Sequence, residues 1–142
     1  GYYRDCFDYG AFQRLLLDPL TSGAAPALIR TRAFDLVSDK LIAARPVAVP
    51  ARGVVLVDGV FLLRAELRDR WDLSILLEVS EQETMRRALA RAGGDSEELR
   101  RLNEARYIAG YQLYQDDAAP KAVASLVIDN NDHANPVITA DR

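Results

Sequence analysis

Three stretches of the chain are apolar without the polar alternation that marks a half-buried strand. They cover residues 53–58, 73–79 and 126–129. Strands of this kind are buried on both faces, which is typical of a parallel sheet covered by helices. A further short strand is predicted at 47–49. In the ambiguous segment 27–34, Leu28, Arg30, Arg32 and Phe34 would share one strand face.

Helical spacing and capping residues predict the elements between these strands. Ser80 and Glu83 form a capping box, Met85, Ala88 and Leu89 give an apolar face, and Gly93-Gly94 ends the helix. Asp95 with Glu98 begins another helix, whose inward residues would be Leu99, Leu102, Ala109 and Leu113, and Pro120 breaks that pattern. Asp5 or Asp8 caps a first helix that ends at Asp18-Pro19, and Arg64 to Arg70 forms a short helix.

Strand, helix, strand, two helices and strand then follow one another, which predicts a parallel sheet with right-handed crossovers. The 142 residues suffice for a single domain, 1–142. The net charge of −3 gives no indication of a nucleic-acid partner, and no apolar run is long enough for a membrane span. The single Cys6 excludes an intrachain disulfide and favours a cytoplasmic location, and we expect its side chain to be buried or half-buried.

Asp58 is the strongest candidate for chemistry because it follows the apolar run 53–57. Open α/β sheets bind ligands at the carboxyl ends of their strands, where a carboxylate can hold Mg²⁺ or its water shell. The plainer interpretation is a turn, because Asp58-Gly59 is also a common turn pair. The position after an apolar strand favours the functional interpretation.

Arginines and aromatic residues supply the other candidates. Arg87 and Arg91 lie four residues apart before a Gly-Gly break, and Arg106 lies beyond it, as in a hinged lid that clamps phosphate. A solvated helix face explains these three arginines equally well, and it explains Arg100 and Arg101 better, since each has a glutamate four residues away. Tyr3, Phe34 and Tyr107 are the aromatic residues chosen as ligand contacts. His133 lies in a polar loop and is expected at the surface.

An ordered series of motifs resembles the uridine kinase-like P-loop kinases, and in particular their short actinobacterial branch. The matching motifs, read in order, are Tyr2-Tyr3-Arg4-Asp5, Asp18-Pro19, Phe34-Asp35, Val57-Asp58-Gly59-Val60-Phe61, Trp71-Asp72, Arg106-Tyr107, Leu113-Tyr114 and Ile128-Asp129-Asn130. They extend over nearly the whole chain. The resemblance implies a three-layer α/β fold with a helical lid at about 86–106.

The resemblance also implies an activity and roles for particular residues. Members of this family use ATP and Mg²⁺ to phosphorylate the 5′-hydroxyl of a nucleoside. Asp58 would match the acidic residue near Mg²⁺, Arg87 and Arg91 the lid, and Arg106 and Tyr107 the segment that follows it. Asn130 would border the nucleotide base, while Arg32 and Phe34 would help to enclose the acceptor.

Two features depart from the family. No G-x-x-x-x-G-K-[ST] motif occurs in the sequence, so the phosphate-binding loop and its strand would precede residue 1 in a longer protein. Cys6 and Ala92 also replace the usual Ser and Asp. Without the central strand, 54–58 and 73–79 would lose their shared neighbour, and the chain would fold poorly, form homo-oligomers through open edges, or adopt a different sheet.

Two alternatives to a nucleoside kinase stay open. One is a kinase with another small hydroxyl acceptor, such as pantothenate, a phosphorylated sugar or a vitamin. The other is a truncated or degenerate domain without catalysis, which binds nucleotide or serves as an interaction module. The missing phosphate-binding loop favours the second alternative for this chain, whereas Asp58 and the lid arginines favour an enzyme for the longer protein.

Overall fold

Two of the three apolar runs become neighbouring strands of one sheet. The computed structural model describes residues 1–35, 37–94 and 96–142. They form two compact units, a larger unit of residues 1–6 and 59–142 and a smaller unit of residues 7–58. The larger unit consists of α1 (Tyr2–Asp5), the 3₁₀ turn η2 (Arg68–Arg70), β5 (Ile75–Glu78), α4 (Glu81–Arg91), α5 (Glu97–Leu102), the π-helical segment η3 (Asn103–Ile108), α6 (Ala109–Ala118), α7 (Pro120–Val123), β6 (Leu126–Asp129) and β7 (Val137–Asp141).

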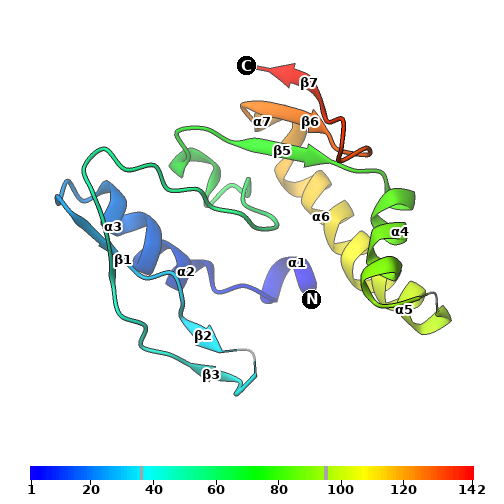
Figure 1. The fold of residues 1–142 in the computed structure, drawn as a ribbon, viewed down its shortest axis with the longest axis horizontal. Helices are drawn as coiled ribbons and strands as arrows, with labels where there is room; N and C mark the ends of the chain where they lie inside the picture. The colour runs from blue at the N-terminus through cyan, green and yellow to red at the C-terminus, as the bar shows by residue number, and fades with distance from the viewer. Residues whose placement is uncertain (36, 95) are drawn as a thin grey trace. The chain divides into compact units, whose positions relative to one another are not determined.

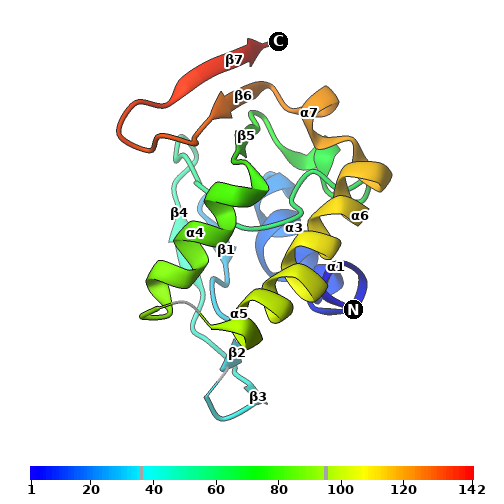
Figure 2. The ribbon, with the colours of Figure 1, turned by 90° about the vertical axis from the view of Figure 1, so that its right-hand side faces the viewer.

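The sheet of the larger unit has the strand order β5-β6-β7. The β5–β6 pair is parallel, as predicted, with Leu76 opposite Val127, and β7 adds an antiparallel edge with a register shift at Val127/Ile128. The chain between β5 and β6 supplies α4 to α7, and α4 and α6 lie on the same side of the sheet (Figure 1; Figure 2). The described residues therefore form a mixed α/β structure with small sheets.

The core of the larger unit lies between the sheet and these helices. Its buried residues include Tyr3, Phe61, Leu76, Tyr114 and Val127. The alternate positions of β5 are about half exposed, Ile75 at 49% and Leu77 at 54%. We had expected burial on both faces of this strand, but the helices of this unit cover only one face.

Helix α4 confirms the capping prediction at both ends. The Ser80 hydroxyl accepts a hydrogen bond from the Glu83 amide at 3.2 Å, and the helix ends at Arg91 before Gly93 and Gly94, which have φ of 85° and 151°. Ser96 caps α5 in the same way, accepting from the Leu99 amide. The predicted role of Asp95 lies outside the described residues.

The segments α5, η3 and α6 run on from one another as one helical rod, because the residues at their junctions keep right-handed helical backbone angles. The predicted inward face is wrong here. Leu102 and Leu113 are nearly half exposed, and the buried positions are instead Gly110, Tyr114 and Ala118. A π-helical segment shifts the side-chain phase, which a pattern assuming 3.6 residues per turn does not anticipate.

Residues 53–58 form no strand, contrary to the prediction. Within the described chain, no backbone group of residues 54–58 takes part in a hydrogen bond, and Val54 and Leu56 are 95% and 90% exposed. Apolar composition makes a segment suitable for a strand, but a strand exists only when a neighbour pairs with it. The predicted helix at 64–70 is shorter in the structure, where residues 65–67 form a turn and only the 3₁₀ turn η2 at Arg68–Arg70 is helical.

The smaller unit packs a helical segment against short antiparallel strand pairs. Its elements are α2 (Tyr9–Phe12), the π-helical segment η1 (Gln13–Leu17), α3 (Asp18–Thr21), β1 (Ala27–Ile29), β2 (Phe34–Asp35), β3 (Lys40–Leu41) and β4 (Val47–Val49). β1 pairs with β4, and β2 with β3.

Three sequence predictions can be compared with this unit. Asp8 caps the first helix, as predicted, by accepting from the Ala11 amide at 2.8 Å. The helix does not end at Asp18-Pro19, because Pro19 occupies the first turn of α3, where a proline is tolerated. β1 ends at Ile29, so of the four residues predicted to share a strand face only Leu28 lies in this strand, exposed between the buried Ala27 and Ile29.

Candidate functional site

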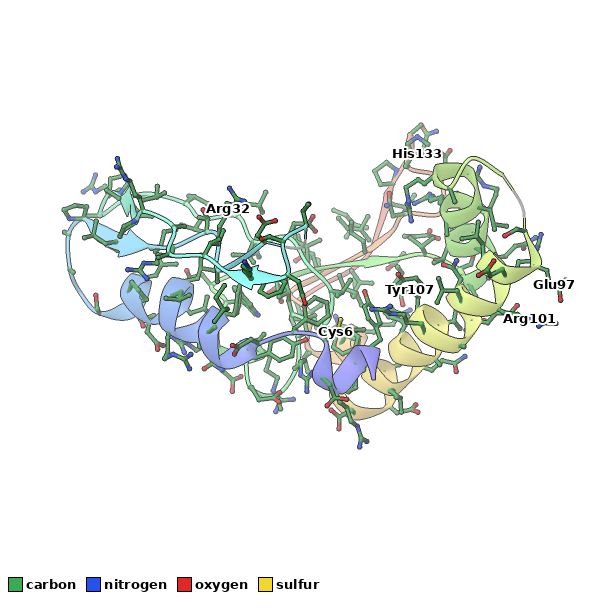
Figure 3. All side chains as sticks on the ribbon, turned by 90° about the horizontal axis from the view of Figure 1, so that it is seen from below. Cys6, Arg32, Glu97, Arg101, Tyr107 and His133 are labelled. Carbon is green, nitrogen blue, oxygen red and sulfur yellow. The ribbon has the colours of Figure 1, made fainter. Side chains whose placement is uncertain are left out.

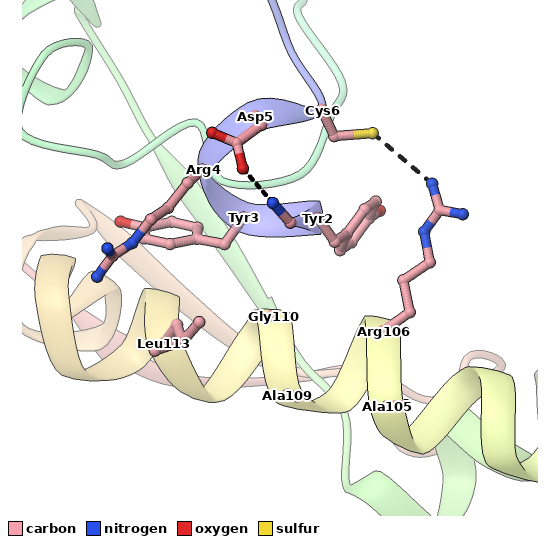
Figure 4. Close-up of a pocket in the computed structure, with 11 residues that line it drawn as sticks. Tyr2, Tyr3, Arg4, Asp5, Cys6, Ala105, Arg106, Ala109, Gly110 and Leu113 are labelled. Carbon is pink, nitrogen blue, oxygen red and sulfur yellow. Dashed lines mark hydrogen bonds and ion pairs between the residues drawn. The ribbon is translucent and has the colours of Figure 1, made fainter.

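One cavity of the larger unit lies between α1 and the helical rod. Its volume is about 730 Å³, within the usual range for small-molecule sites. Residues 1–6 line one side, and Ala105, Arg106, Ala109, Gly110 and Leu113 line the other (Figure 4). Two segments more than a hundred residues apart in sequence therefore form one site.

Gly110 allows α1 to approach the rod closely. A Cβ atom at this position would lie 2.9 Å from Cδ1 of Tyr2, closer than real contacts allow. The tyrosine ring thus lies directly over the rod, at the edge of the cavity. It stacks edge-on against Tyr107, with ring centroids 4.9 Å apart.

Arg106 lines the cavity from the helical rod, and Arg4 and Asp5 line it from α1. The guanidinium carbon of Arg106 lies 5.4 Å from the ring centroid of Tyr2 and 5.6 Å from that of Tyr107, and Nη2 is 3.8 Å from Sγ of Cys6 (Figure 4). Among the residues that the structure describes, no carboxylate oxygen lies within 4.0 Å of a guanidinium nitrogen of Arg106, so Arg106 forms no ion pair there. Arg106 therefore offers N–H donors to an anion, beside aromatic rings that suit a planar group.

A π-helical segment carries both Arg106 and Tyr107. Such segments are rare inside helices and frequently occur at functional sites, because they redirect neighbouring side chains. Here the result is that two adjacent residues both reach the ring of Tyr2. The structure thus brings together the two residues that the resemblance had placed after the lid.

Tyr3 occupies the core beneath the cavity. Its side chain is 3% exposed, and its hydroxyl donates to Oδ2 of Asp117 at 2.6 Å. Burial raises the pKa of Tyr3 to about 12, and this hydrogen bond is the second-largest cause of the rise. Arg64 donates to the Tyr3 carbonyl at 2.7 Å and lies 4.4 Å from the ring centroid. Tyr3 is also one of the residues that line the cavity, so its role as a substrate contact stays a prediction.

A second cluster of polar residues surrounds Arg87 at the carboxyl ends of the parallel strands. Nε donates to Glu83 Oε1 at 2.7 Å, and Nη2 donates to the carbonyl oxygens of Asn130 and Asn131 at 2.7 and 2.9 Å. Arg86 also donates twice to Glu83, and the two arginines lower the pKa of Glu83 to about 2. Arg87 and Asn130, both predicted as site residues, are therefore in direct contact.

The remaining predicted residues occupy separate places. Arg91 is the exposed last residue of α4. In the smaller unit, Arg32 is exposed between β1 and β2, Phe34 is 43% exposed in β2, and Asp58 is exposed at the end of the unpaired segment. The exposed position of His133 confirms its prediction (Figure 3).

Sequence reasoning missed some residues of the cavity. Tyr2 and Gly110 line the cavity but are not among the predicted site residues. Cys6 is exposed, whereas we had expected burial. The contact between α1 and the rod joins residues far apart in sequence, and local patterns do not reveal such contacts. Only the series of motifs could have pointed to these cavity residues.

Comparisons of the chain with protein-family models, curated proteins and solved structures found no match. Among the residues that the structure describes, no helix is both long and apolar enough to cross a membrane. Within the same residues, no group of three or more His, Cys, Asp or Glu side chains is placed to hold a metal ion.

Proposed function

We propose that this chain carries part of the machinery of a uridine kinase-type phosphotransferase with the three-layer P-loop kinase fold. The enzyme would transfer the γ-phosphate of ATP to the 5′-hydroxyl of a nucleoside. The phosphate-binding loop is absent from this sequence, so the activity is proposed for a polypeptide that also contains that loop.

The cavity beside Arg106 is the observation that carries this proposal. A nucleoside and its 5′-monophosphate combine a planar base with a ribose and, in the product, a phosphate. The ring of Tyr2, which lines the cavity, provides a surface for the base, and the Arg106 guanidinium provides forked donors for phosphate oxygens. A cavity of about 730 Å³ has room for such a ligand.

The arrangement of the larger unit also supports the proposal. The β5–β6 pair is parallel and connected through helices, and the turn that carries Asn130 lies at the carboxyl end of β6. In open α/β sheets this edge is where ligands bind. Strand β5 runs to the same edge, and this parallel pair is compatible with the proposed fold.

Asp58 fits the single protein carboxylate that a kinase-type Mg²⁺ site requires. Mg²⁺ keeps several waters and takes its other ligands from substrate phosphates, so one exposed carboxylate is sufficient on the protein side. When bound, the ion would neutralise charge on the phosphates. Asp58 would hold the ion's water shell, Arg106 would orient the acceptor, and Asn130 would border the nucleotide base.

A module that binds nucleotide without catalysis is the second candidate. It is favoured by the unpaired segment 53–58, because Asp58 then lies at the end of a segment that no sheet positions. A catalytic carboxylate requires a rigid support to keep its position. The kinase and the module would both bind nucleotide, but only the kinase would transfer phosphate.

Titration calorimetry tests the binding step on this chain, with uridine 5′-monophosphate, uridine and inorganic phosphate as ligands. We expect the monophosphate to bind most tightly and Arg106→Ala to weaken it at least about tenfold, the size of one charge-assisted bond. The control is Arg101→Ala, because Arg101 pairs with Glu97 at the outer end of the rod and does not line the cavity (Figure 3). Equal binding by wild type and Arg106→Ala would exclude the cavity.

Phosphotransfer is then measured with labelled ATP, Mg²⁺ and a panel of nucleosides, pantothenate and sugar phosphates, on the polypeptide that includes the phosphate-binding loop. Transfer to uridine supports the kinase, and transfer to another acceptor changes its substrate. Binding without transfer to any acceptor supports the module. Neither binding nor transfer would refute both candidates.

A further inference from the structure

The Arg87 guanidinium is hydrogen-bonded to backbone carbonyl groups. Of its five N–H donors, Nε uses one on Glu83, and Nη2 uses two on the carbonyl oxygens of Asn130 and Asn131. The side chain is 22% exposed. A residue that clamps phosphate bidentately would present two nitrogens together, and here Nη2 is already bonded to two consecutive carbonyl groups and Nε to Glu83.

The turn that Arg87 holds lies at the carboxyl edge of the parallel strand pair. The Asn130 amide donates to the carbonyl of Glu78, at the end of β5, at 2.8 Å. The Ser80 amide, at the start of α4, donates to Oδ1 of Asn131 at 2.9 Å. The turn is thus fixed by the strand end and the helix start, and Arg87 adds a third support from the second turn of α4.

This edge is also hollow. A cavity of about 280 Å³ is lined by Ser80, Gln82, Glu83, Arg86 and Asn131. Asn131 lines the cavity with its side chain and contacts Arg87 through its carbonyl. A change in the Arg87 contact would therefore move a residue that lines the hollow.

We infer that Arg87 is a positioning residue, which holds the turn at Asn130 and Asn131 in the conformation that receives a nucleotide, and that it does not clamp phosphate. The inference rests on the proposed function, since it assigns the ligand of this turn as a nucleotide. Glu83 fixes the guanidinium in place, because it accepts from Nε and is kept ionised by the two arginines. α4 and the turn then behave as one rigid support.

The test compares Arg87→Ala and Arg87→Lys with Arg101→Ala, in the polypeptide that includes the phosphate-binding loop. Arg101 is the control because it is a helical arginine paired with a glutamate, Glu97, and it lines neither cavity. The measurements are kcat, KM for ATP, KM for uridine, and amide hydrogen exchange at residues 129–132.

For Arg87→Ala we expect KM for ATP to rise about tenfold, the size of one to two lost hydrogen bonds, with kcat and KM for uridine within about twofold. Exchange at residues 129–132 should accelerate in parallel. Arg87→Lys should be nearly as impaired, because one ammonium group cannot replace both the Nε bond to Glu83 and the Nη2 bonds to the two carbonyls. Arg101→Ala should behave as wild type.

Three results would overturn the inference. A fall in kcat with unchanged KM for ATP, partly restored by lysine, would identify a phosphate clamp. Faster exchange without a change in KM for ATP would make the contact structural only, and both results would leave the proposed function standing. Absence of phosphotransfer in the wild-type polypeptide would instead refute the proposed function, and this inference with it.

Discussion

The Tyr3 hydroxyl offers a sharp test of how α1 is attached to the larger unit. Tyr3→Phe keeps the ring in the core and removes only the bond to Asp117, at 2.6 Å. Hydrogen bonds to charged groups contribute roughly 1.5–3 kcal/mol. The lower end applies because Asp117 is exposed and water can replace the lost donor. We therefore expect a loss of about 1.5 kcal/mol at pH 8, or about 3–6 °C in Tm.

The dependence on pH distinguishes this bond from a loss of packing. The folded state raises the pKa of Tyr3 from 10.0 to about 12, so it favours the protonated hydroxyl. The stability gained in this way is complete below pH 10 and is lost as the pH rises through 12. Wild type should lose this contribution between pH 10 and 12, whereas Tyr3→Phe has no hydroxyl to titrate.

Urea denaturation followed by circular dichroism at pH 8, 10 and 11.5 measures both effects. Titration of the other residues is common to the two proteins and cancels in the difference between them. Tyr107→Phe is the control, because its ring is 37% exposed, and it should change stability by less than about 0.5 kcal/mol. A difference between wild type and Tyr3→Phe that is zero at pH 8, or that stays constant up to pH 11.5, would refute the reasoning.

Two further predictions concern the close approach at Gly110 and the exposed segment 53–58. Gly110→Ala should loosen α1 at a cost of about 1–2 kcal/mol, because a new Cβ would lie 2.9 Å from the Tyr2 ring; amide exchange in α1 measures this, and adding Tyr2→Ala should remove the cost. Wild type should associate with rising concentration through the apolar unpaired segment, and Leu56→Lys should reduce this association in sedimentation equilibrium; a wild type that stays monomeric at all concentrations would contradict it.

Local signals predicted several elements correctly. Ser80 begins α4 and Gly93-Gly94 follows its end, because a hydroxyl cap and a left-handed glycine act on the residues next to them. The runs that became β5 and β6 were also found, together with their parallel pairing. The connection through helices leaves little choice of direction for two neighbouring strands.

Interactions across long sequence separations decided the rest. Residues 53–58 and 126–129 have similar apolar patterns, yet only the second forms a strand, because only it has neighbours with which to pair. Arg87 and Arg91 look alike in sequence, but one reaches two carbonyl groups 43 and 44 positions away and the other is the exposed end of its helix.

The sequence by itself therefore determined the segments able to form helices and strands, the helix caps, and a set of candidate residues that includes Arg106, Tyr107 and Asn130. Tertiary structure decided which segments found partners, which side chains entered the core, as Tyr3 does, and which lined a cavity, as Arg106 does. The physical reason is that caps and propensities act over a few residues. Burial and strand pairing depend instead on segments that only folding brings together.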